Sequence, residues 1–566
     1  MTSARSRPGR STRTGPRRAP GSARVAALLA ACFATALLVY RPALDGPLVS
    51  DDAHYLGNPY VRELSWERLP ALLDPAGEPA RLIENYAPVH LLLHALEWKL
   101  FGERLRPFHV VNVALHAMVS VLLIALLLRS GVPSGPALFG GGFFLLHPAN
   151  VEAVAWISQL KTLSSTLLAL AALWLLPRRP TLATLAFALS LLAKATAAFT
   201  LPVAAVFAWV RWRSGSDPGR RPAAWLCAWT VIFLAFAVVE FTAFERATWQ
   251  VAPVDADPWV RLRSAFELVA RYLAMAATSY GVSAFQEPEP AVSLLGPWWL
   301  DGLAAVAALG VRALLALRGG REEAAWWVWA AVSFLPVAQI FPFPFPLADR
   351  YLYQMLPGLL GGTLLALLPL HARLPTRSPA LERLLLVAGV AVLLAFAARS
   401  HERAALWSNP ALLAADAAIH YPNGRHAHLL RAHAAARRGE FSSAVDSLRG
   451  AYARGFDRFE QLLAAPDFVS LRRDPRFRAL LRDMAGRWIE RIGPLERPSQ
   501  SELYSLAIAH RLRGEEGRAR SLLERALVAG GPLDGTIRAE LAESQIPREL
   551  LAPGPPGDAA LPARRP

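Results

Sequence analysis

The stretch Val25 to Tyr40 reads VAALLAACFATALLVY and contains neither a charged residue nor a proline. A run of this kind predicts a helix that crosses a lipid bilayer, whose hydrocarbon core takes roughly 20 apolar residues. Similar stretches recur as far as about Ala398, and hydrophobic residues make up 54% of the chain. Because this exceeds what one globular core needs, the sequence predicts an all-α protein with a polytopic membrane domain.

Arginines are distributed unevenly around this first span. Residues 1–24 carry seven arginines among Ser, Pro and Gly, and no acidic residue, which predicts a disordered cytoplasmic tail. The apolar run is long for the core of a signal peptide and has no small-residue cleavage site before Arg41, so we expect a retained anchor. The chain after Tyr40 then emerges on the outer face of the membrane.

Ten further candidate spans follow the first. They cover about 107–128, 137–146, 155–176, 181–193, 196–210, 224–244, 297–317, 324–341, 352–370 and 384–398. The total of eleven places the basic loops at 178–179, 211–221, 318–321 and 371–383 on the cytoplasmic side, as the distribution of positive charge in membrane proteins requires. We therefore predict a multi-pass cell-membrane protein whose membrane domain covers residues 25–399. Stretches 89–101 and 266–280 are expected to be interfacial or re-entrant helices.

The C-terminal part of the chain has a different composition. Residues 400–546 are rich in Arg, Ala, Glu and Leu at helical spacing, which predicts a water-soluble domain, here external. The pattern Gly439, Phe441, Ala444, Leu448, Ala451 is repeated as Gly514, Ala519, Leu523, Ala526. Such spacing of small residues is typical of tetratricopeptide-like helical hairpins, whose concave surface binds a protein or peptide. The alternative is that this domain only caps the membrane domain. Residues 547–566 are predicted to be a disordered tail.

The net charge of +16 and the pI near 10.6 raise the question of nucleic acid as a partner. No nucleic-acid-binding motif accompanies the charge, and arginines between apolar spans are better explained by membrane orientation. We therefore predict membrane lipid, and no nucleic acid, as a partner. The two cysteines, Cys32 and Cys227, both lie in apolar segments, so no disulfide framework is predicted.

An acidic pair, Asp51 and Asp52, follows the first span. Charge near hydrocarbon is costly, so ionisable groups at a membrane edge are often functional. The alternative is the start of a solvated loop, where charge costs little.

Further polar motifs follow this pair in order. They are Asn58-Pro59, Tyr86-x-Pro88, Leu100-Phe101-Gly102, Phe108-His109-x-x-Asn112-x-x-Leu115-His116, the segment FFLLHPANVEAVAWIS at 143–158, Leu191-Leu192-Ala193-Lys194, and Asp349-Arg350-Tyr351-Leu352-Tyr353. The ordered set resembles the transmembrane and tetratricopeptide-repeat O-mannosyltransferases and their bacterial relatives, which have the multi-spanning GT-C glycosyltransferase fold. The resemblance covers about residues 51–353. It implies transfer of a sugar from a polyprenyl-phosphate donor to an acceptor, such as a protein hydroxyl, on the outer face. Mannose is the sugar in the named family, and for this chain the sugar stays open.

The chemistry of such a transfer gives the motifs their expected roles. A carboxylate must deprotonate the acceptor hydroxyl, for which Asp51 or Asp52 is suited. The departing phosphate needs cations, for which Lys194 and Arg350 are the candidates. Glu152 is a second carboxylate or orients a positive group.

Substrate-binding candidates from the same motifs are Tyr86, His147, Lys194, Asp349, Arg350 and Tyr351. Structural alternatives remain: His147 as a hydrogen-bonding group at a helix end, Asp349 with Arg350 as an ion pair, and Lys194 as a cation that snorkels to the interface. No metal site is predicted, since the histidines at 90, 94, 109 and 116 give an incomplete ligand set on one helix face. A divalent cation is left open as a cofactor, and no other cofactor is expected.

Three positions depart from the family pattern. Ala87 replaces an arginine, Gln159-Leu160-Lys161 lacks the expected acid, and Ala195 replaces a glutamate after Lys194. Either the cavity is remodelled or catalysis has decayed, leaving a membrane scaffold that recruits partners through its repeats. Retained Asp51, Asp52 and Glu152 favour activity. A transporter is disfavoured, because no matched inverted halves are found.

Overall fold

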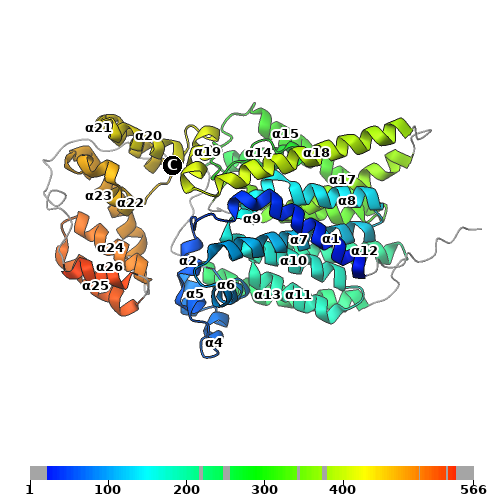
Figure 1. Ribbon diagram of the computed structural model, residues 1–566, viewed down its shortest axis with the longest axis horizontal. Coiled ribbons are helices and arrows are strands. Elements are labelled where there is room, and N and C mark those ends of the chain that lie inside the picture. The colour runs from blue at the N-terminus through cyan, green and yellow to red at the C-terminus, as the bar shows by residue number, and fades with distance from the viewer. Residues whose placement is uncertain are drawn as a thin grey trace, which may run out of the picture.

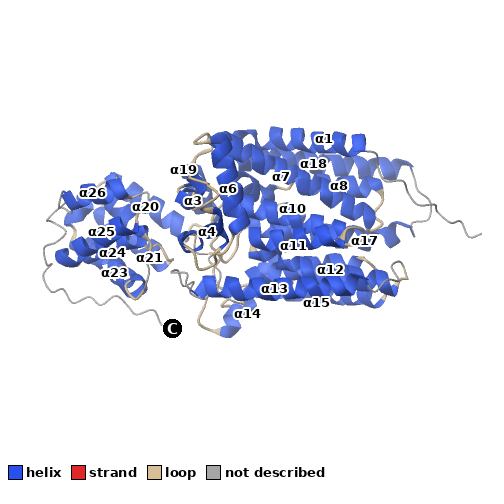
Figure 2. Ribbon diagram, turned by 90° about the horizontal axis from the view of Figure 1, so that it is seen from below, coloured by secondary structure: helices blue, strands red, loops and turns tan. Residues whose placement is uncertain are grey.

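The computed structural model describes residues 22–83, 85–215, 221–245, 255–340, 345–372, 379–495, 498–530 and 533–542. All regular secondary structure in these ranges is helical (Figure 2), which confirms the all-α class. A long bundle of nearly parallel helices carries a smaller helical domain beside one end (Figure 1). The predicted tail at 547–566, and most of that at 1–24, lie outside the described residues.

Eleven helices build the bundle within the described part of the chain. They are α1 (Ser22–Tyr40), α7 (Leu105–Arg129), α8 (Ser134–Leu146), α10 (Leu160–Leu175), α11 (Pro180–Ala193), α12 (Thr200–Arg213), α13 (Arg221–Glu245), α15 (Pro297–Arg318), α16 (Glu323–Phe334), α17 (Asp349–Ala372) and α18 (Pro379–Leu406). Each overlaps one predicted span. Seven apolar helices in the described ranges are long enough to cross a membrane: Ser22–Ala43, Leu105–Arg129, Ala195–Arg213, Ala223–Thr242, Pro297–Arg318, Asp349–Pro369 and Pro379–Leu406. This indicates a membrane protein, and the count of eleven spans stays a prediction.

Several helices are shorter than the spans predicted for them. The predicted span 155–176 is interrupted: α9 (Val151–Ala155) ends at Trp156, and α10 begins only after the 3-10 turn η3 (Ile157–Gln159). The Asn112 side chain donates to the carbonyls of Trp156 and Ile157, at 3.0 and 3.3 Å. These bonds tie α7 to the interrupted segment and add to the backbone bonds that the same two carbonyls accept from the amides of Gln159 and Leu160.

Two other predicted boundaries differ from the observed helices. The span 324–341 is replaced by α16 and the turn η5 (Leu335–Val337), which contains Pro336, a residue that cannot continue the helix hydrogen bonding. The boundary at 399/400 falls inside α18. There Ser400 is buried and donates to the carbonyl of Leu146 at 2.8 Å, so the last turns of α18 still pack on the bundle.

Short helices cover the end of the bundle beside the smaller domain (Figure 1). They are α2 (Asp52–Leu56), α3 (Pro59–Arg62), α4 (Leu69–Leu73), α5 (Glu78–Leu82) and α6 (Pro88–Phe101). The helix α6 coincides with the predicted stretch 89–101. The stretch 266–280 lies in a longer helix, α14 (Pro258–Thr278), which begins at an Asp257 cap that accepts from the Trp259 amide at 2.8 Å.

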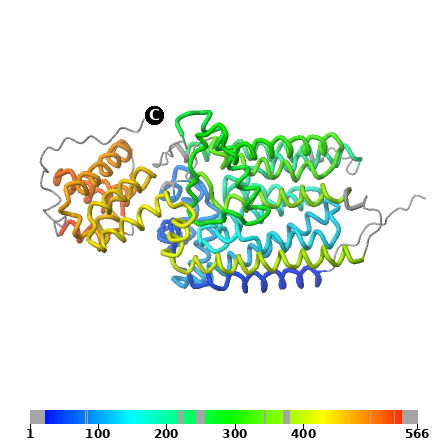
Figure 3. Tube along the Cα trace, turned by 90° about the horizontal axis from the view of Figure 1, so that it is seen from above, coloured from blue at the N-terminus to red at the C-terminus, as the bar shows by residue number. Residues whose placement is uncertain are grey.

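The C-terminal domain is a succession of short helices (Figure 3); from residue 425 on they have a core separate from that of the bundle, while Leu413 of the first helix packs in the bundle core. Its helices are α19 (Pro410–His420), α20 (Arg425–Arg437), α21 (Phe441–Ala453), α22 (Phe459–Ala464), the 3-10 helix η6 (Pro466–Arg473), α23 (Pro475–Ile492), α24 (Gln500–Leu512), α25 (Glu516–Ala529) and α26 (Asp534–Ala542). The pairs α20 with α21 and α24 with α25 form helical hairpins. Ala444 and Ala519 are fully buried at equivalent places in the two hairpins.

Candidate functional site

Asp52 ties the start of α2 to the turn that follows α9. Its side chain is almost fully buried and accepts the amides of Val49 and Ser158, both at 2.8 Å. Burial raises the pKa of Asp52 to about 7, against these hydrogen bonds, which lower it. Both carboxylate oxygens of Asp52 are therefore engaged by backbone amides, and its predicted catalytic role stays a prediction.

Asp51 is the more accessible member of the acidic pair, with a side chain 35% exposed. Its carboxylate accepts from the Ser158 hydroxyl at 2.9 Å and lies 3.5 Å from the ammonium of Lys161. Lys161 also donates to the Tyr55 hydroxyl at 2.9 Å. Of the two carboxylates, Asp51 is therefore the one that is open to solvent.

Lys161 was not among the predicted site residues. In the sequence it marks only a departure from the family pattern. A lysine at the beginning of an otherwise apolar helix is nevertheless a signal in its own right, because such a charge needs a partner. Its position beside Asp51 makes it part of the site.

Glu152 and Arg350 form a second, buried pair. One carboxylate oxygen accepts the Arg350 amide at 2.7 Å, and the other pairs with the guanidinium. The guanidinium also lies 5.1, 4.6 and 4.8 Å from the ring centroids of Trp156, Phe345 and Tyr351, a cation–π arrangement. Arg350 thus pairs with Glu152, and the alternative ion pair with Asp349 does not describe the structure.

Lys194 lies directly after α11, where the chain turns extended before the short 3-10 helix η4 (Ala195–Phe199). Its ammonium donates to the Thr162 hydroxyl at 2.8 Å. It interacts electrostatically with Lys161, Arg350, Glu152 and Asp51. We call Asp51, Glu152, Lys161, Lys194 and Arg350 the polar cluster; its members come from five separate segments and share one end of the bundle.

Asp349 connects this end of the bundle to the C-terminal domain. Its carboxylate accepts the Ser283 amide at 3.3 Å and the side chain of Gln286. Gln286 in turn accepts the Tyr421 hydroxyl at 2.9 Å. Asp349 therefore contacts the segment at 283–286, which in turn contacts the C-terminal domain. The hydroxyl of the nearby Tyr351 lies beside the Arg350 guanidinium.

Tyr86 and His147 make their hydrogen bonds elsewhere. The Tyr86 hydroxyl donates to the carbonyl of Leu73 at 2.8 Å. His147 is fully buried, with one ring nitrogen 3.1 Å from the carbonyl of Ala276 and the other accepting the Ala149 amide at 3.2 Å. The structure has His147 as a hydrogen-bonding group at the end of α8, the structural alternative.

Two histidines of α6 are buried near the polar cluster. His94 lies 2.7 Å from the carboxylate of Glu97, and the ring of His90 lies 4.6 Å from that of Tyr55. Burial, together with the charges of His94, Lys161 and Lys194, lowers the pKa of His90 well below its usual value. Among the described residues, no group of three or more His, Cys, Asp or Glu is arranged to hold a metal ion.

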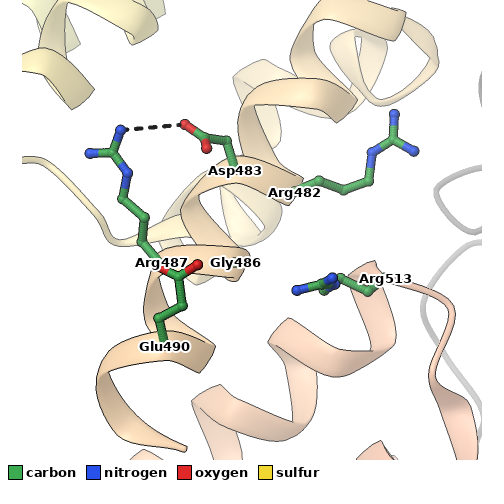
Figure 4. Close-up of a pocket in the computed structure, with 6 residues that line it drawn as sticks. All are labelled: Arg482, Asp483, Gly486, Arg487, Glu490 and Arg513. Carbon is green, nitrogen blue, oxygen red and sulfur yellow. Dashed lines mark ion pairs between the residues drawn. The ribbon is translucent and has the colours of Figure 1, made fainter. Parts of the chain in front are cut away.

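Two surface pockets lie away from the polar cluster. One, of about 540 Å³, is in the C-terminal domain (Figure 4). Its lining comes from α23 and the residue after α24: Arg482, Asp483, Gly486, Arg487, Glu490 and Arg513. The other, of about 280 Å³, lies at the opposite end of the bundle.

Comparisons of the chain with protein-family models, curated proteins and solved structures found no match.

Proposed function

We propose that the protein is a GT-C-type membrane glycosyltransferase that moves a sugar from a polyprenyl-phosphate donor to an acceptor hydroxyl on the outer face of the membrane. The proposal keeps the eleven spans, the cytoplasmic N-terminus and an external tetratricopeptide-like domain. The observation that carries it is the position of Asp51. This accessible carboxylate lies at one end of the bundle with three basic side chains, Lys161, Lys194 and Arg350.

The reaction requires one proton transfer and one displacement. Asp51 accepts the proton of the acceptor hydroxyl while the acceptor oxygen bonds to the anomeric carbon. The bond between that carbon and the phosphate oxygen breaks, and the phosphate leaves with the electron pair. A cation beside the phosphate stabilises the charge that develops there.

Lys194 is the best placed amine for the phosphate. Burial, with the charges of Lys161 and Arg350, lowers its pKa well below the usual value, and a phosphate beside it would favour the charged form. Arg350 is already neutralised by Glu152, and Lys161 lies beside Asp51. Lys194 donates to a neutral hydroxyl and forms no ion pair within the described ranges. Arg350 and Glu152 then act as positioning residues that hold the start of α17 against α9.

The C-terminal helical hairpins support a second binding role. Hairpins stacked in series present a concave surface that suits an extended protein or peptide. We propose that this domain, joined to the bundle through Asp349, Gln286 and Tyr421, delivers a protein acceptor.

A catalytically decayed scaffold is the second candidate. The observation that favours it is that Asp51 with Lys161, and Glu152 with Arg350, compensate each other's charge. A purely structural cluster would have the same pairs. In that case the repeats would recruit partners and the bundle would only anchor them.

The decisive test is donor turnover by the purified full-length protein with a panel of polyprenyl-phosphate sugars and hydroxyl-bearing peptides. A general base contributes about a hundred- to ten-thousand-fold, so Asp51→Asn should lower turnover on that scale without changing the melting temperature. Asp45→Asn is the control, because this side chain is 70% exposed and lies outside the polar cluster. Turnover of no donor, or unchanged turnover by Asp51→Asn, would favour the scaffold.

Orientation has its own test. After Cys32 and Cys227 are replaced by alanine, single cysteines at Ser50 and Ser442 should both react with an impermeant thiol reagent on intact cells. Protection of either site would contradict the count of eleven spans.

A further inference from the structure

The pocket of about 280 Å³ lies where α7, α10 and α12 end and α13 begins. This is the end of the bundle at which α1 starts, opposite the end that bears the short helices α2–α6 (Figures 1 and 3). Its apolar lining includes Leu126, Leu173, Ala204, Phe207 and Trp225. Its remaining lining includes three arginines, Arg129, Arg178 and Arg211.

The charges around this pocket do not balance. Arg211 donates to both carboxylate oxygens of Glu322, at 2.6 and 3.2 Å. Across the described ranges Arg129 and Arg178 form no ion pair, and Arg129 interacts electrostatically with Glu322 as well as with both other arginines. Among the described residues, three guanidinium groups thus lie at a cavity with one carboxylate beside it, so that positive charge exceeds negative charge there.

Helix capping explains only part of this arrangement. Arg129 donates to the carbonyls of Leu173 and Trp174, at 3.3 and 2.8 Å, and so serves the end of α10. Arg178 is exposed after that end and makes no such contact in the described structure. Capping therefore accounts for Arg129, but not for the convergence of Arg178 and Arg211 on the same cavity.

We infer that this pocket binds the phosphate headgroup of an anionic membrane phospholipid. The headgroup oxygens would lie among the three arginines, where charge-assisted hydrogen bonds are strong. The first part of an acyl chain would follow the apolar lining along α7 and α12. Basic pockets between membrane helices at the level of the headgroups suit this chemistry. The inference needs the bundle to lie in a membrane, but does not depend on sugar transfer.

The test is a lipid titration of the delipidated full-length protein, read by native mass spectrometry. Phosphatidylglycerol should bind, and phosphatidylcholine should bind at least tenfold more weakly. Arg178→Gln should weaken phosphatidylglycerol binding about fivefold, since one basic residue near the headgroups contributes on the order of 1 kcal/mol. Arg179→Gln is the matched control, because Arg179 is the exposed neighbour and does not line the pocket.

A second arm separates a lipid from a free anion. Inorganic phosphate at millimolar concentration should not displace phosphatidylglycerol, because it cannot use the apolar lining. Displacement by phosphate, equal binding of the two lipids, or equal effects of Arg178→Gln and Arg179→Gln would each overturn the inference. Arg178→Gln is preferred to Arg129→Gln because it removes no helix cap.

Discussion

The bundle and the C-terminal domain are both built of helices, yet they distribute polar and apolar side chains between surface and interior in opposite ways. In the bundle, large apolar side chains such as Leu394, 65% exposed, point outward, while Glu152 and Arg350 are buried. In the C-terminal domain Phe468 and Phe477 are buried, while the pair Arg520–Glu524 lies at the surface with 67% and 59% exposure. This difference fits helices of the bundle that face lipid and helices of the C-terminal domain that face water.

The difference also changes what an ion pair does. A surface pair contributes little, because water screens it and solvates both partners separately. A buried pair must be complete, because removal of one partner leaves an uncompensated charge. In the bundle the pairs Asp51–Lys161 and Glu152–Arg350 hold together segments that are far apart in sequence.

The largest effect should come from breaking such a buried pair. Glu152→Gln leaves the Arg350 guanidinium without a counter-charge and should destabilise the bundle by about 3–5 kcal/mol. Glu524→Gln, the matched change in the C-terminal domain, should cost less than about 0.5 kcal/mol. Thermal unfolding of both variants in detergent measures the contrast. Equal effects would mean that the Glu152–Arg350 pair is solvated after all.

The next contrast concerns exposed apolar residues. Leu394 lies near the middle of α18, so Leu394→Arg should make membrane insertion of this helix less favourable by about 3–4 kcal/mol. Val528 is 90% exposed in the C-terminal domain, and Val528→Arg should change stability by less than about 0.5 kcal/mol. A glycosylation-mapping assay measures the insertion of α18 with Leu394→Arg. Thermal melting measures the stability of the Val528→Arg variant. Normal insertion of Leu394→Arg would place that face of α18 against protein or water.

Much of the fold was predictable because it follows from local composition. Every predicted span overlaps a helix, and the small residues at Ala444 and Ala519 are buried in two hairpins as their spacing indicated. The exact ends of the helices were harder to predict. At the break after α9 the chain is contacted by Asn112, a residue on another helix, and the last turns of α18 contact Leu146. Neither partner is visible in the local sequence.

The sequence predicted most of the residues that belong to the candidate site, but not which of them form ion pairs with each other. The motifs named Asp51, Glu152, Lys194 and Arg350, and the structure brings these to one end of the bundle. The partner of Arg350 was open, because Asp349 is adjacent in sequence and Glu152 is close only in space. Lys161 was missed because its role depends on Asp51, which is distant along the chain.

The two regions should also differ in their pH dependence. The pKa of Asp52 is raised to about 7 by burial, so the folded state holds its proton more tightly than the unfolded state. Stability should therefore fall as pH rises from about 4 to 7, by at most about 1.4 kcal/mol per pH unit.

Asp416, on α19 where the C-terminal domain meets α18 of the bundle, behaves in the opposite sense. Burial raises its pKa, but the hydrogen bonds and charge of Arg403 outweigh burial and the pKa is lowered. Its contribution is present above the unfolded pKa near 4 and is lost at lower pH. When melting temperatures are measured across pH, Asp52→Asn should reduce the change of stability between about pH 4 and 7. Asp416→Asn should reduce the change of stability below about pH 4. If either variant had the same pH dependence of its melting temperature as the unmodified protein, that aspartate would not be the source of the effect.

The smallest contrast concerns glycine, which the two regions use for different reasons. In the bundle, a methyl group at Gly361 would collide with the indole of Trp326, so Gly361→Ala should cost about 1–3 kcal/mol through overpacking. In the C-terminal domain, Gly439 and Gly514 have φ of +76° and +82° in the turns of the two hairpins, with open space around each.

Alanine in these two turns meets no neighbour and is strained only by its backbone, which costs roughly 1 kcal/mol. Hydrogen exchange of the α20–α21 and α24–α25 amides in the full-length protein should report this loss separately for Gly439→Ala and Gly514→Ala. Gly517→Ala is the control, because Gly517 lies inside α25 with open space around it, and alanine there should be neutral or stabilising by up to about 1 kcal/mol. If the turn variants matched this control, the two hairpins would not depend on left-handed glycines, and the repeated Gly439 and Gly514 would need another explanation.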